Sequence, residues 1–237
     1  MPDGLATSPA GTVAFDLGGH ELVADPAGVL WWPAEATLVV ADLHFEKGSA
    51  FAERGQLLPP YDTRATLDRL AAVLDRYAPA RVICLGDSFH DDRAGGRMAV
   101  ADRQRLTTLA GGRDWVWVTG NHDPLPPAGL GGEVVEEVML AGLVLRHCAL
   151  PEETGAEISG HFHPKVRVDT KTRRVVRPCF VEDGWRLILP AFGAYTGGLS
   201  ILDPAVRGLL GTSFRAHLVG RERIYSFPSD GGQLVGG

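Results

Sequence analysis

Three short apolar runs constrain the fold of this chain more than any other feature of its sequence. Uninterrupted apolar runs of this length are expected of strands that are buried on both faces, and they span residues 38–41, 82–85 (in a predicted strand that begins at Arg81) and 115–118. Between them, apolar residues recur at helical spacing over residues 64–77 and 97–109. The alternation of strand and helix at this spacing predicts a βαβ series with a parallel sheet, and therefore an α/β protein.

Each of the three predicted strands leads into side chains that can bind a metal. These segments are Asp42-Leu43-His44, Gly86-Asp87 and Gly120-Asn121-His122-Asp123, and Gly120 is expected to free the backbone for its turn. Functional sites in parallel sheets gather beyond the carboxyl ends of the strands, so these residues are expected to meet at one edge. Taken singly, each segment also suits an ordinary turn, and Asp87 suits the cap of a helix that begins at Ser88. Their placement after successive strands favours one shared site.

The rest of the chain is mainly β-like. Runs precede the βαβ series at residues 12–15, 21–24 and 28–32, and a loop that contains Pro59-Pro60 is expected between the run 38–41 and the first helix. The later runs are 133–140 and 143–147 (expected as a hairpin), 157–159, 166–169, 174–176, 179–182, 185–189, 216–218 and 224–227. We expect a single domain with two sheets over residues 12–228, and loose tails at residues 1–11 and 229–237.

The bulk composition narrows the class of protein. No window approaches the ~18 apolar residues of a membrane span, and the N-terminus lacks the pattern of a signal peptide. The three cysteines are widely spaced, which argues against a disulfide framework and predicts a cytoplasmic protein. The formal net charge of −6 differs from that of a general nucleic-acid binder, although a local basic stripe can still steer one.

The densest basic stretch permits two interpretations. Its members are Lys165, Arg167, Lys171, Arg173, Arg174 and Arg177. Cations at the edge of a hairpin discourage pairing with other sheets, and this is the first interpretation. The second is a surface that contacts a phosphate backbone, in which Lys165 and Arg167 lie nearest to the last histidines and bind substrate.

Histidines complete a larger constellation of possible ligands. Six of the eight histidines fall in or beside the polar clusters, including His147 and the pair in Gly160-His161-Phe162-His163. Mixed carboxylate, amide and imidazole ligands suit Mn, Fe or Zn. The candidate metal ligands are Asp42, His44, Asp87, Asn121, His147, His161 and His163. One ion cannot use all seven, whereas two ions that share a carboxylate can, and such pairs promote in-line displacement at phosphorus.

In this order, the motifs resemble those of the calcineurin-like metallophosphoesterases over about residues 38–164. The resemblance implies a four-layer α/β/β/α sandwich of two mixed sheets flanked by helices, built around two divalent metal ions. Mn²⁺ is the first choice for these ions, and Fe or Zn is the alternative. It assigns Asp42, His44, Asp87 and His163 to the first ion, and Asp87 (as a bridge), Asn121, His147 and His161 to the second. It implies that His122 faces the scissile phosphate, with Asp123 behind it to orient its ring.

Further segments are similar to those of the bacterial ligase-associated DNA damage response endonucleases. They are Trp31-Trp32-Pro33, residues 41–47, Gly86-Asp87-Ser88-Phe89-His90-Asp91, Arg177-Pro178-Cys179-Phe180 and residues 189–198. This resemblance implies DNA repair, His90 near the phosphate, and a functional link to a DNA ligase and a helicase, and it leaves a homo-oligomer open. Arg146 departs from the family pattern, in which many members carry Gly before the ligand that corresponds to His147.

The activity implied is phosphodiester hydrolysis, with a metal-bridging water or hydroxide as the nucleophile. His122 would stabilise the charge that develops or protonate the leaving oxygen. The expected substrate is nucleic acid. One alternative is a small diester such as a 2′,3′-cyclic nucleotide, which the acidic net charge favours. Another is a non-catalytic scaffold on the same fold, which would be expected to have lost ligands.

Overall fold

Four parallel strands form the part of the fold that the apolar runs predict. The computed structural model describes residues 9–123, 125–153, 155–169, 174–230 and 233–234. In it, β4 (Thr37–Val40), β5 (Arg81–Leu85), β6 (Asp114–Val118) and β7 (Glu133–Val135) lie side by side and parallel. The antiparallel strands β1 (Val13–Leu17), β2 (His20–Ala24) and β3 (Leu30–Trp32) extend this sheet, with the 3₁₀ turn η1 (Pro33–Glu35) before β4. The order β1-β2-β3-β4-β5-β6-β7 makes a mixed sheet.

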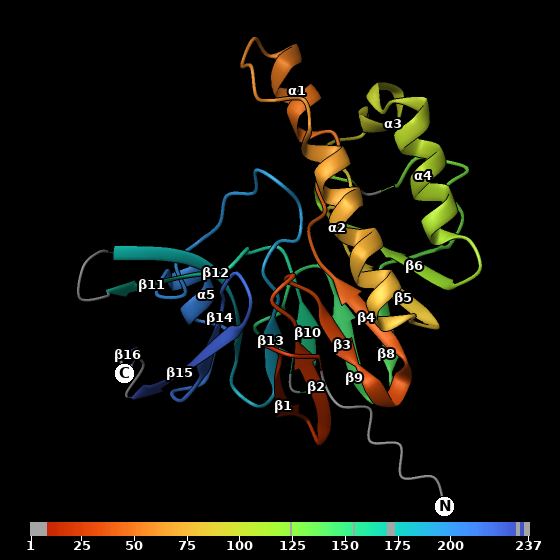
Figure 1. The fold of residues 1–237 in the computed structure, drawn as a ribbon. Helices are drawn as coiled ribbons and strands as arrows, with labels where there is room; N and C mark the ends of the chain where they lie inside the picture. The colour runs from red at the N-terminus through yellow and green to blue at the C-terminus, as the bar shows by residue number, and fades with distance from the viewer. Residues whose placement is uncertain (1–8, 124, 154, 170–173, 231–232, 235–237) are drawn as a thin grey trace, which may run out of the picture.

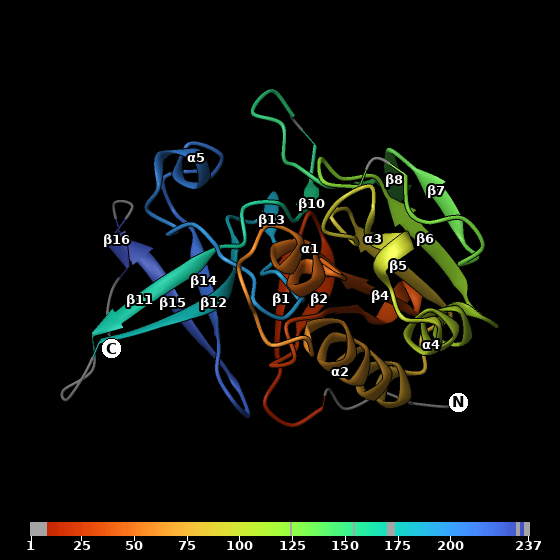
Figure 2. The ribbon, with the colours of Figure 1, turned by 90° about the horizontal axis from the view of Figure 1, so that it is seen from above.

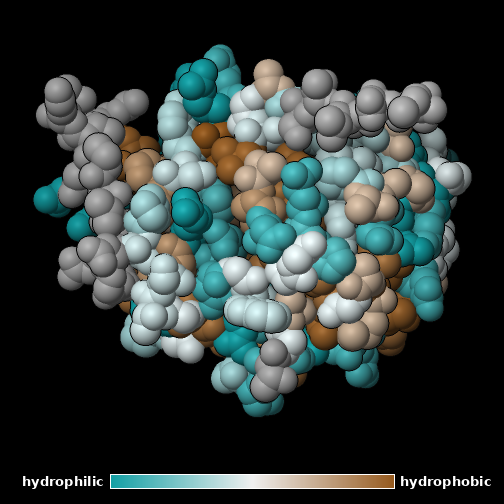
Figure 3. All heavy atoms as spheres, turned by 90° about the horizontal axis from the view of Figure 1, so that it is seen from below, coloured by the Kyte–Doolittle hydropathy of each residue, from teal (hydrophilic) through white to brown (hydrophobic). Residues whose placement is uncertain are grey.

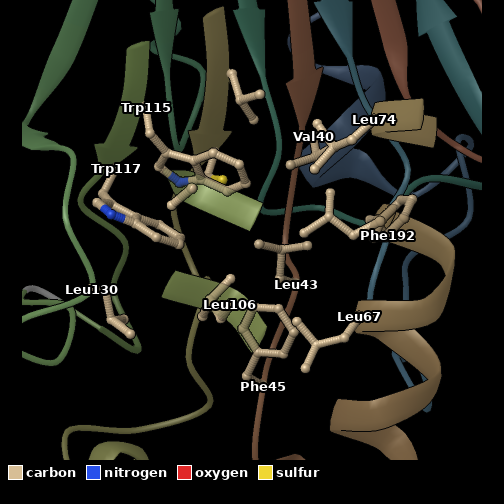
Figure 4. Close-up of a cluster of buried hydrophobic side chains, with 14 of the residues drawn as sticks. Val40, Leu43, Phe45, Leu67, Leu74, Leu106, Trp115, Trp117, Leu130 and Phe192 are labelled. Atoms are coloured by element: carbon tan, nitrogen blue, oxygen red, sulfur yellow. The ribbon is translucent and has the colours of Figure 1, made fainter. Parts of the chain in front are cut away.

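Helices cover one face of this first sheet. They are α1 (Lys47–Glu53), α2 (Asp62–Tyr77), α3 (Ala94–Arg97) and α4 (Val100–Ala110). Leu67 and Leu74 of α2 pack with Leu106 of α4 and with Trp115 and Trp117 of β6 (Figure 4). The predicted helix 64–77 is confirmed, and it ends before Pro79 as expected. The expected helix 97–109 is instead divided into α3 and α4, and α1 lies in a segment that was expected to be a loop.

The second sheet comes from the β-like half of the chain. Its strands are β8 (Glu137–Leu140), β9 (Leu143–Arg146), β10 (Glu157–Ser159), β11 (Lys165–Asp169), β12 (Arg174–Glu182), β13 (Arg186–Ile188), β14 (Arg215–Val219), β15 (Ile224–Asp230) and β16 (Gln233–Leu234). Their order is β16-β15-β14-β12-β13-β10-β9-β8, and β11 pairs with β12. Among the described pairings of this sheet, those of β10 with β9 and with β13 are parallel and the others are antiparallel, so this sheet is also mixed.

The two sheets pack face to face over a shared apolar core. Leu30, Val39 and Ile83 of the first sheet contact the layer that contains Leu145 and Phe180 of the second. A further core lies on the outer face of the second sheet, under the short helix α5 (Pro204–Arg207). Figure 1 shows α1 to α4 on one side of the molecule and α5 with β11, β12, β14 and β15 on the other. The predicted sandwich of two mixed sheets is confirmed, with few helices on its second outer face.

Two parts of the predicted strand pattern differ in the structure. The run 133–140 is divided between the sheets, because β7 pairs with β6 whereas β8 pairs with β9. The runs 174–176 and 179–182 form one strand, β12, which changes partner from β11 to β14 after Pro178. The predicted hairpin is confirmed for β8 and β9, and β12 also pairs antiparallel with β13. Strand pairing also extends past residue 228, since Ser229 pairs with Leu234.

The cysteines and the exposed surface have the features that we predicted from the composition. All three cysteines are free, and Cys84 and Cys179 are buried. The face turned away from α1 shows hydrophobic residues between hydrophilic ones (Figure 3). Within the described ranges, no helix has the length and apolarity required to cross a membrane. Residues 1–8 of the expected N-terminal tail, and residues 231–232 and 235–237 of the C-terminal one, lie outside the described residues.

Candidate metal centre

The loops that follow β4 and β5 are held together by backbone hydrogen bonds that continue the parallel ladder. The His44 N–H donates to the Asp87 carbonyl (2.9 Å), and the Phe45 N–H donates to the Ser88 carbonyl (2.9 Å). The second sheet joins them through His147, whose Nδ1 lies 3.0 Å from the Leu85 carbonyl oxygen. The predicted ligands therefore meet where the strand ends of both sheets converge.

Two groups of side chains could each hold a metal ion. The first contains Asp42, His44 and His163, and the second contains Asp87, His147 and His161, with the ligand atoms of each group within 4.8 Å of one another. Asp87 lies between the groups, because its Oδ2 is 3.8 Å from His44 Nε2 and 3.5 Å from His147 Nε2. Asn121 adds to the second group, since its Oδ1 lies 2.9 Å from His147 Nε2. All seven candidate ligands are thus brought together.

The donor atoms suit divalent cations. Asp42 is fully buried and Asp87 nearly so. Ring nitrogens face one another, with 3.4 Å between His44 Nε2 and His163 Nε2 and 3.1 Å between His161 Nδ1 and His147 Nε2. The Leu85 carbonyl accepts the proton of His147 Nδ1, so the lone pair on Nε2 faces the Asn121 oxygen. Lone pairs that face one another around buried carboxylates are stabilised by a cation between them.

Burial keeps two of the histidine ligands, His44 and His161, neutral. It lowers the pKa of His44 to about 2, with smaller contributions from the charges of His163 and Lys47. Burial is also the largest cause of the lowered pKa of His161. Neutral imidazole is the form that binds a metal, so the site is prepared for ligation at neutral pH.

The backbone at these ligands is strained. Five of the seven adopt the left-handed conformation that side chains other than glycine seldom adopt, with φ of 54° at Asp42, 44° at His44, 45° at Asp87, 68° at His161 and 47° at His163. Strain of this kind persists where the surrounding structure holds it, and it clusters at functional sites. Asp87 accordingly does not cap a helix, because its Oδ1 accepts a hydrogen bond from the His122 N–H (2.9 Å).

Glycines bring the loops to within contact of the ligands. A Cβ on Gly120 would lie 2.2 Å from the Asp87 nitrogen, and one on Gly160 would lie 2.7 Å from Asp42 Oδ2. Gly120 does not have a left-handed φ. Its role is therefore to give room to Asp87, and not the backbone freedom that the sequence suggested.

His122 lies beside both metal groups and belongs to neither. Its Nδ1 lies 2.9 Å from the carbonyl oxygen of His90, which leaves Nε2 free. Its ring is exposed, with ring centroids 5.2 Å from His44 and 5.3 Å from His90. His90 itself is buried, and burial lowers its pKa to about 4, followed by the charge of Lys47.

Asp123 makes a different contact from the one predicted. Its Oδ2 accepts a hydrogen bond from the Phe89 N–H (2.9 Å), whereas the His122 ring bonds to the His90 carbonyl. Burial raises the pKa of Asp123 to about 7. Asp123 therefore supports the loop that carries Asp87, and it acts on His122 only through that loop.

Helix α1 is the part of the site that the sequence did not reveal. Phe51 lies against His90, with 5.7 Å between ring centroids, and Lys47 Nζ lies 5.9 Å from the centroid of Phe51. Figure 2 shows α1 over the middle of the molecule, on the side where β4 to β6 end. The helix is anchored at Ser49, whose hydroxyl donates to Glu46 (2.7 Å) and accepts from Arg97 (3.0 Å). In the sequence, this helix was indicated only by Lys47, which belongs to the family-like segment 41–47 and had no role assigned to it.

The basic stretch is divided by the pairing of β11 with β12. Lys165 and Arg167 lie on one face, and Arg177 pairs with Val166 on the other, because neighbouring residues alternate between faces. Lys165 is half-buried, with its Nζ 3.3 Å from the Thr196 carbonyl, and Arg167 is exposed. Lys171 and Arg173 lie outside the described residues.

Comparison with solved structures gives a strong match to a nuclease. The sequence matches no protein-family model and no curated protein. The nuclease MPE of Pseudomonas putida is 30% identical, with a TM-score of 0.70 over 91% of this chain and 99% of that one. The phosphoesterase YfcE from E. coli is a weaker match, with 15% identity and a TM-score of 0.40 over 80% of this chain and 97% of that one. A protein of unknown function from Aquifex aeolicus, AQ665, is 16% identical, with a TM-score of 0.37 over 54% of this chain and 78% of that one. Neither weaker likeness carries an argument about the site.

Proposed function

The chain belongs to the metallophosphoesterase family, as a metal-dependent phosphodiesterase, and we propose that it cleaves nucleic acid in DNA repair by using two divalent ions. The observation that carries this proposal is the pair of Asp/His groups, with Asp87 between them. A complete set of ligands argues against a scaffold with a degenerate site. The name of the P. putida relative, a nuclease, supports a polynucleotide as the substrate.

The ligands divide as the two groups suggest. Asp42, His44, Asp87 and His163 would hold the first ion, and Asp87, Asn121, His147 and His161 would hold the second. When bound, such ions neutralise the phosphoryl oxygens and activate water for in-line attack. The mixture of oxygen and nitrogen donors suits Mn²⁺, and Fe or Zn also fits.

His122 is the side chain we propose to act on the phosphate. The His90 carbonyl holds the Nδ1 proton, so that Nε2 faces outward beside the metal groups. From there, a protonated His122 would stabilise the phosphoryl charge or protonate the leaving oxygen. His90 packs on the His122 ring and would fix its orientation. Asp123 would position Asp87 through the Phe89 N–H.

Lys165 and Arg167 would contact the phosphate backbone of the substrate. Both lie on β11, just after the ligand His163, and on the same face of the strand. Contacts of this kind make binding steeply dependent on salt concentration, so a weak salt slope would count against the assignment. The cytoplasmic location, the link to a ligase and a helicase, and a homo-oligomer stay predictions of the sequence.

A small diester such as a 2′,3′-cyclic nucleotide is the second candidate substrate. The net charge of −6 favours it, because a long polyanion would be repelled by much of the surface.

One assay separates these proposals. With Mn²⁺ present, bis(p-nitrophenyl) phosphate is compared with p-nitrophenyl phosphate, and then with single-stranded and duplex DNA and RNA. We expect turnover of the diester in preference to the monoester, and cleavage of a polynucleotide. Turnover of the model diester without any polynucleotide would favour the small-diester function. Failure to hydrolyse any diester would refute both.

A further inference from the structure

A hollow lies beside the metal centre, on the arm formed by β11 and β12. Its volume is ≈ 570 Å³, and its lining includes Lys165, Arg167, Val176, Gly198, Ser200 and Leu202. Binding sites for small molecules typically span about 300–1,000 Å³. The hollow is thus of a size to hold one nucleotide. Figure 2 shows the arm that carries it, extending from the molecule to the left of α1.

The backbone fixes the hollow relative to the metal ligand His163. The Lys165 N–H donates to the Leu199 carbonyl (2.7 Å), and the Leu199 N–H donates to the Phe162 carbonyl (3.1 Å). Gly198 lies so close that a Cβ would be 2.2 Å from the His163 carbonyl oxygen. One wall of the hollow and the loop of His163 are therefore parts of the same pairing.

The lining combines cations with exposed apolar side chains. Lys165 and Arg167 supply charge, whereas Val176 and Leu202 are 55% and 57% exposed. Apolar side chains open to solvent beside a cation suit a ligand that has an anionic group and a flat, weakly polar one. A nucleotide has both, since its phosphate is charged and its base has a π-face.

Lys47 lies near the metal centre, because its Nζ is 5.9 Å from the centroid of Phe51, whose ring lies against His90. Its pKa is lowered by burial and then by the charge of Lys165, although Asp62 acts to raise it. The charge of Lys47 in turn lowers the pKa of His44 and His90. Lysines near a centre that would hold two divalent ions repel one another and the ions, unless an anion lies among them. A chain of phosphates passing from the metal centre to the hollow would provide that anion.

We propose that the hollow binds the nucleotide next to the scissile phosphate, with Lys165 and Arg167 at its phosphate and Val176 and Leu202 against its base. This inference rests on the proposed cleavage of nucleic acid and adds the path of the strand. It also implies a preference for polynucleotides over small diesters, because a small diester bound at the metal centre is too short to extend into the hollow.

The test introduces a carboxylate into the wall through Val176→Asp and Leu202→Asp. Both side chains are exposed, so the fold should tolerate the change. We expect the ratio of kcat/KM for a short oligothymidylate to that for bis(p-nitrophenyl) phosphate to fall about tenfold. The Kd of a fluorescent oligothymidylate, measured by anisotropy without metal, should rise by a similar factor. Val176→Asn should show a smaller effect, because it removes apolar contact without adding charge.

Val134→Asp is the matched control. Val134 is 45% exposed and lies on β7, outside the hollow, so its variant should match the wild type in ratio and Kd. An oligouridylate is tested in parallel to identify which sugar the hollow accepts. A lower kcat/KM ratio and a higher Kd of the hollow variants with either strand support the proposal. An unchanged ratio and Kd in both hollow variants, with the diester still hydrolysed, would overturn this inference and leave the proposed function intact. Absence of diester hydrolysis by the wild type would instead refute the function.

Discussion

Replacing Gly120 by alanine should disable the metal centre without replacing any ligand side chain. The added Cβ would lie 2.2 Å from the Asp87 nitrogen, 2.3 Å from Asp87 Oδ1 and 2.8 Å from Asp123 Oδ1. Ordinary contact begins near 3.4 Å. Asp87 would therefore have to move by about 1 Å, and a displacement of that size at a reacting centre can cost about a hundredfold in rate.

The same substitution should also reduce stability. The Cβ meets backbone and a buried carboxylate, neither of which can rotate away, so overpacking should cost about 1–3 kcal/mol of the free energy of unfolding. Because Asp87 lies between the two groups, its displacement should weaken both candidate metal sites. We expect reduced affinity for Mn²⁺ by titration, a fall of about a hundredfold in kcat for bis(p-nitrophenyl) phosphate, and a folded protein with a lower Tm.

Gly197→Ala is the control. Gly197 has no left-handed φ, and a Cβ there would meet nothing within 4 Å, so this variant should match the wild type. The reasoning would be refuted if Gly120→Ala bound Mn²⁺ and hydrolysed the diester as the wild type does. It would also be refuted if Tm fell while metal affinity and kcat stayed unchanged, because the Cβ would then have been accommodated away from Asp87.

Three further substitutions test other parts of the site. His122→Asn should retain both ions in a metal titration and lose about 10²–10⁴-fold in kcat, most of all for diesters with poor leaving groups; loss of metal would contradict its assignment. Asn121→Ala should lower the number of bound Mn²⁺ ions and nearly abolish turnover, and full activity of the folded variant would refute the two-ion proposal. Burial is the largest single influence on the pKa of Asp91 and acts to raise it, but the hydrogen bond and charge of Arg97 and the hydrogen bond from the Arg93 N–H together outweigh burial. The folded pKa of Asp91 therefore lies below 3.8, and the stability that this carboxylate contributes is present above that pH and lost as the pH falls through the folded pKa. Arg97→Met should therefore cost about 1–2 kcal/mol of unfolding free energy at pH 7 and less as the pH falls below 4; a cost independent of pH in urea titrations would show that the ion pair contributes nothing.

The sequence predicted the part of the fold where local pattern and burial agree. Strands β4, β5 and β6 are apolar because they are buried on both faces, so their runs could be recognised without a partner. The clusters of candidate ligands could then be predicted, because they come directly after these strands in the sequence. Strand β7 was missed as a separate element, because the break between Val135 and Glu137 is one residue long and only the pairing assigns the two sides to different sheets.

Other features depend on contacts between distant residues. Helix α1 has seven residues and no long apolar face, and its anchors are side chains outside it, such as Thr63, which donates to Glu46 (2.8 Å). The partner of Asp123 could not be inferred, since the Phe89 N–H that it binds is 34 positions away. The division of the basic stretch follows from its strand register, which spacing alone does not give.

The geometry of the metal centre resides in the backbone more than in the ligands. Each left-handed residue other than glycine costs about 1–3 kcal/mol, and five ligands adopt this conformation. The strain is held by hydrogen bonds between loops, such as those from the Gly160 N–H to the His147 carbonyl (2.9 Å) and from the Gly193 N–H to the Asp42 carbonyl (3.0 Å). Exchanging a ligand side chain leaves these bonds in place, whereas adding a Cβ where the loops touch displaces them. Glycines at these contacts should therefore be as sensitive to substitution as the ligands, although they have no side chain that could bind a metal.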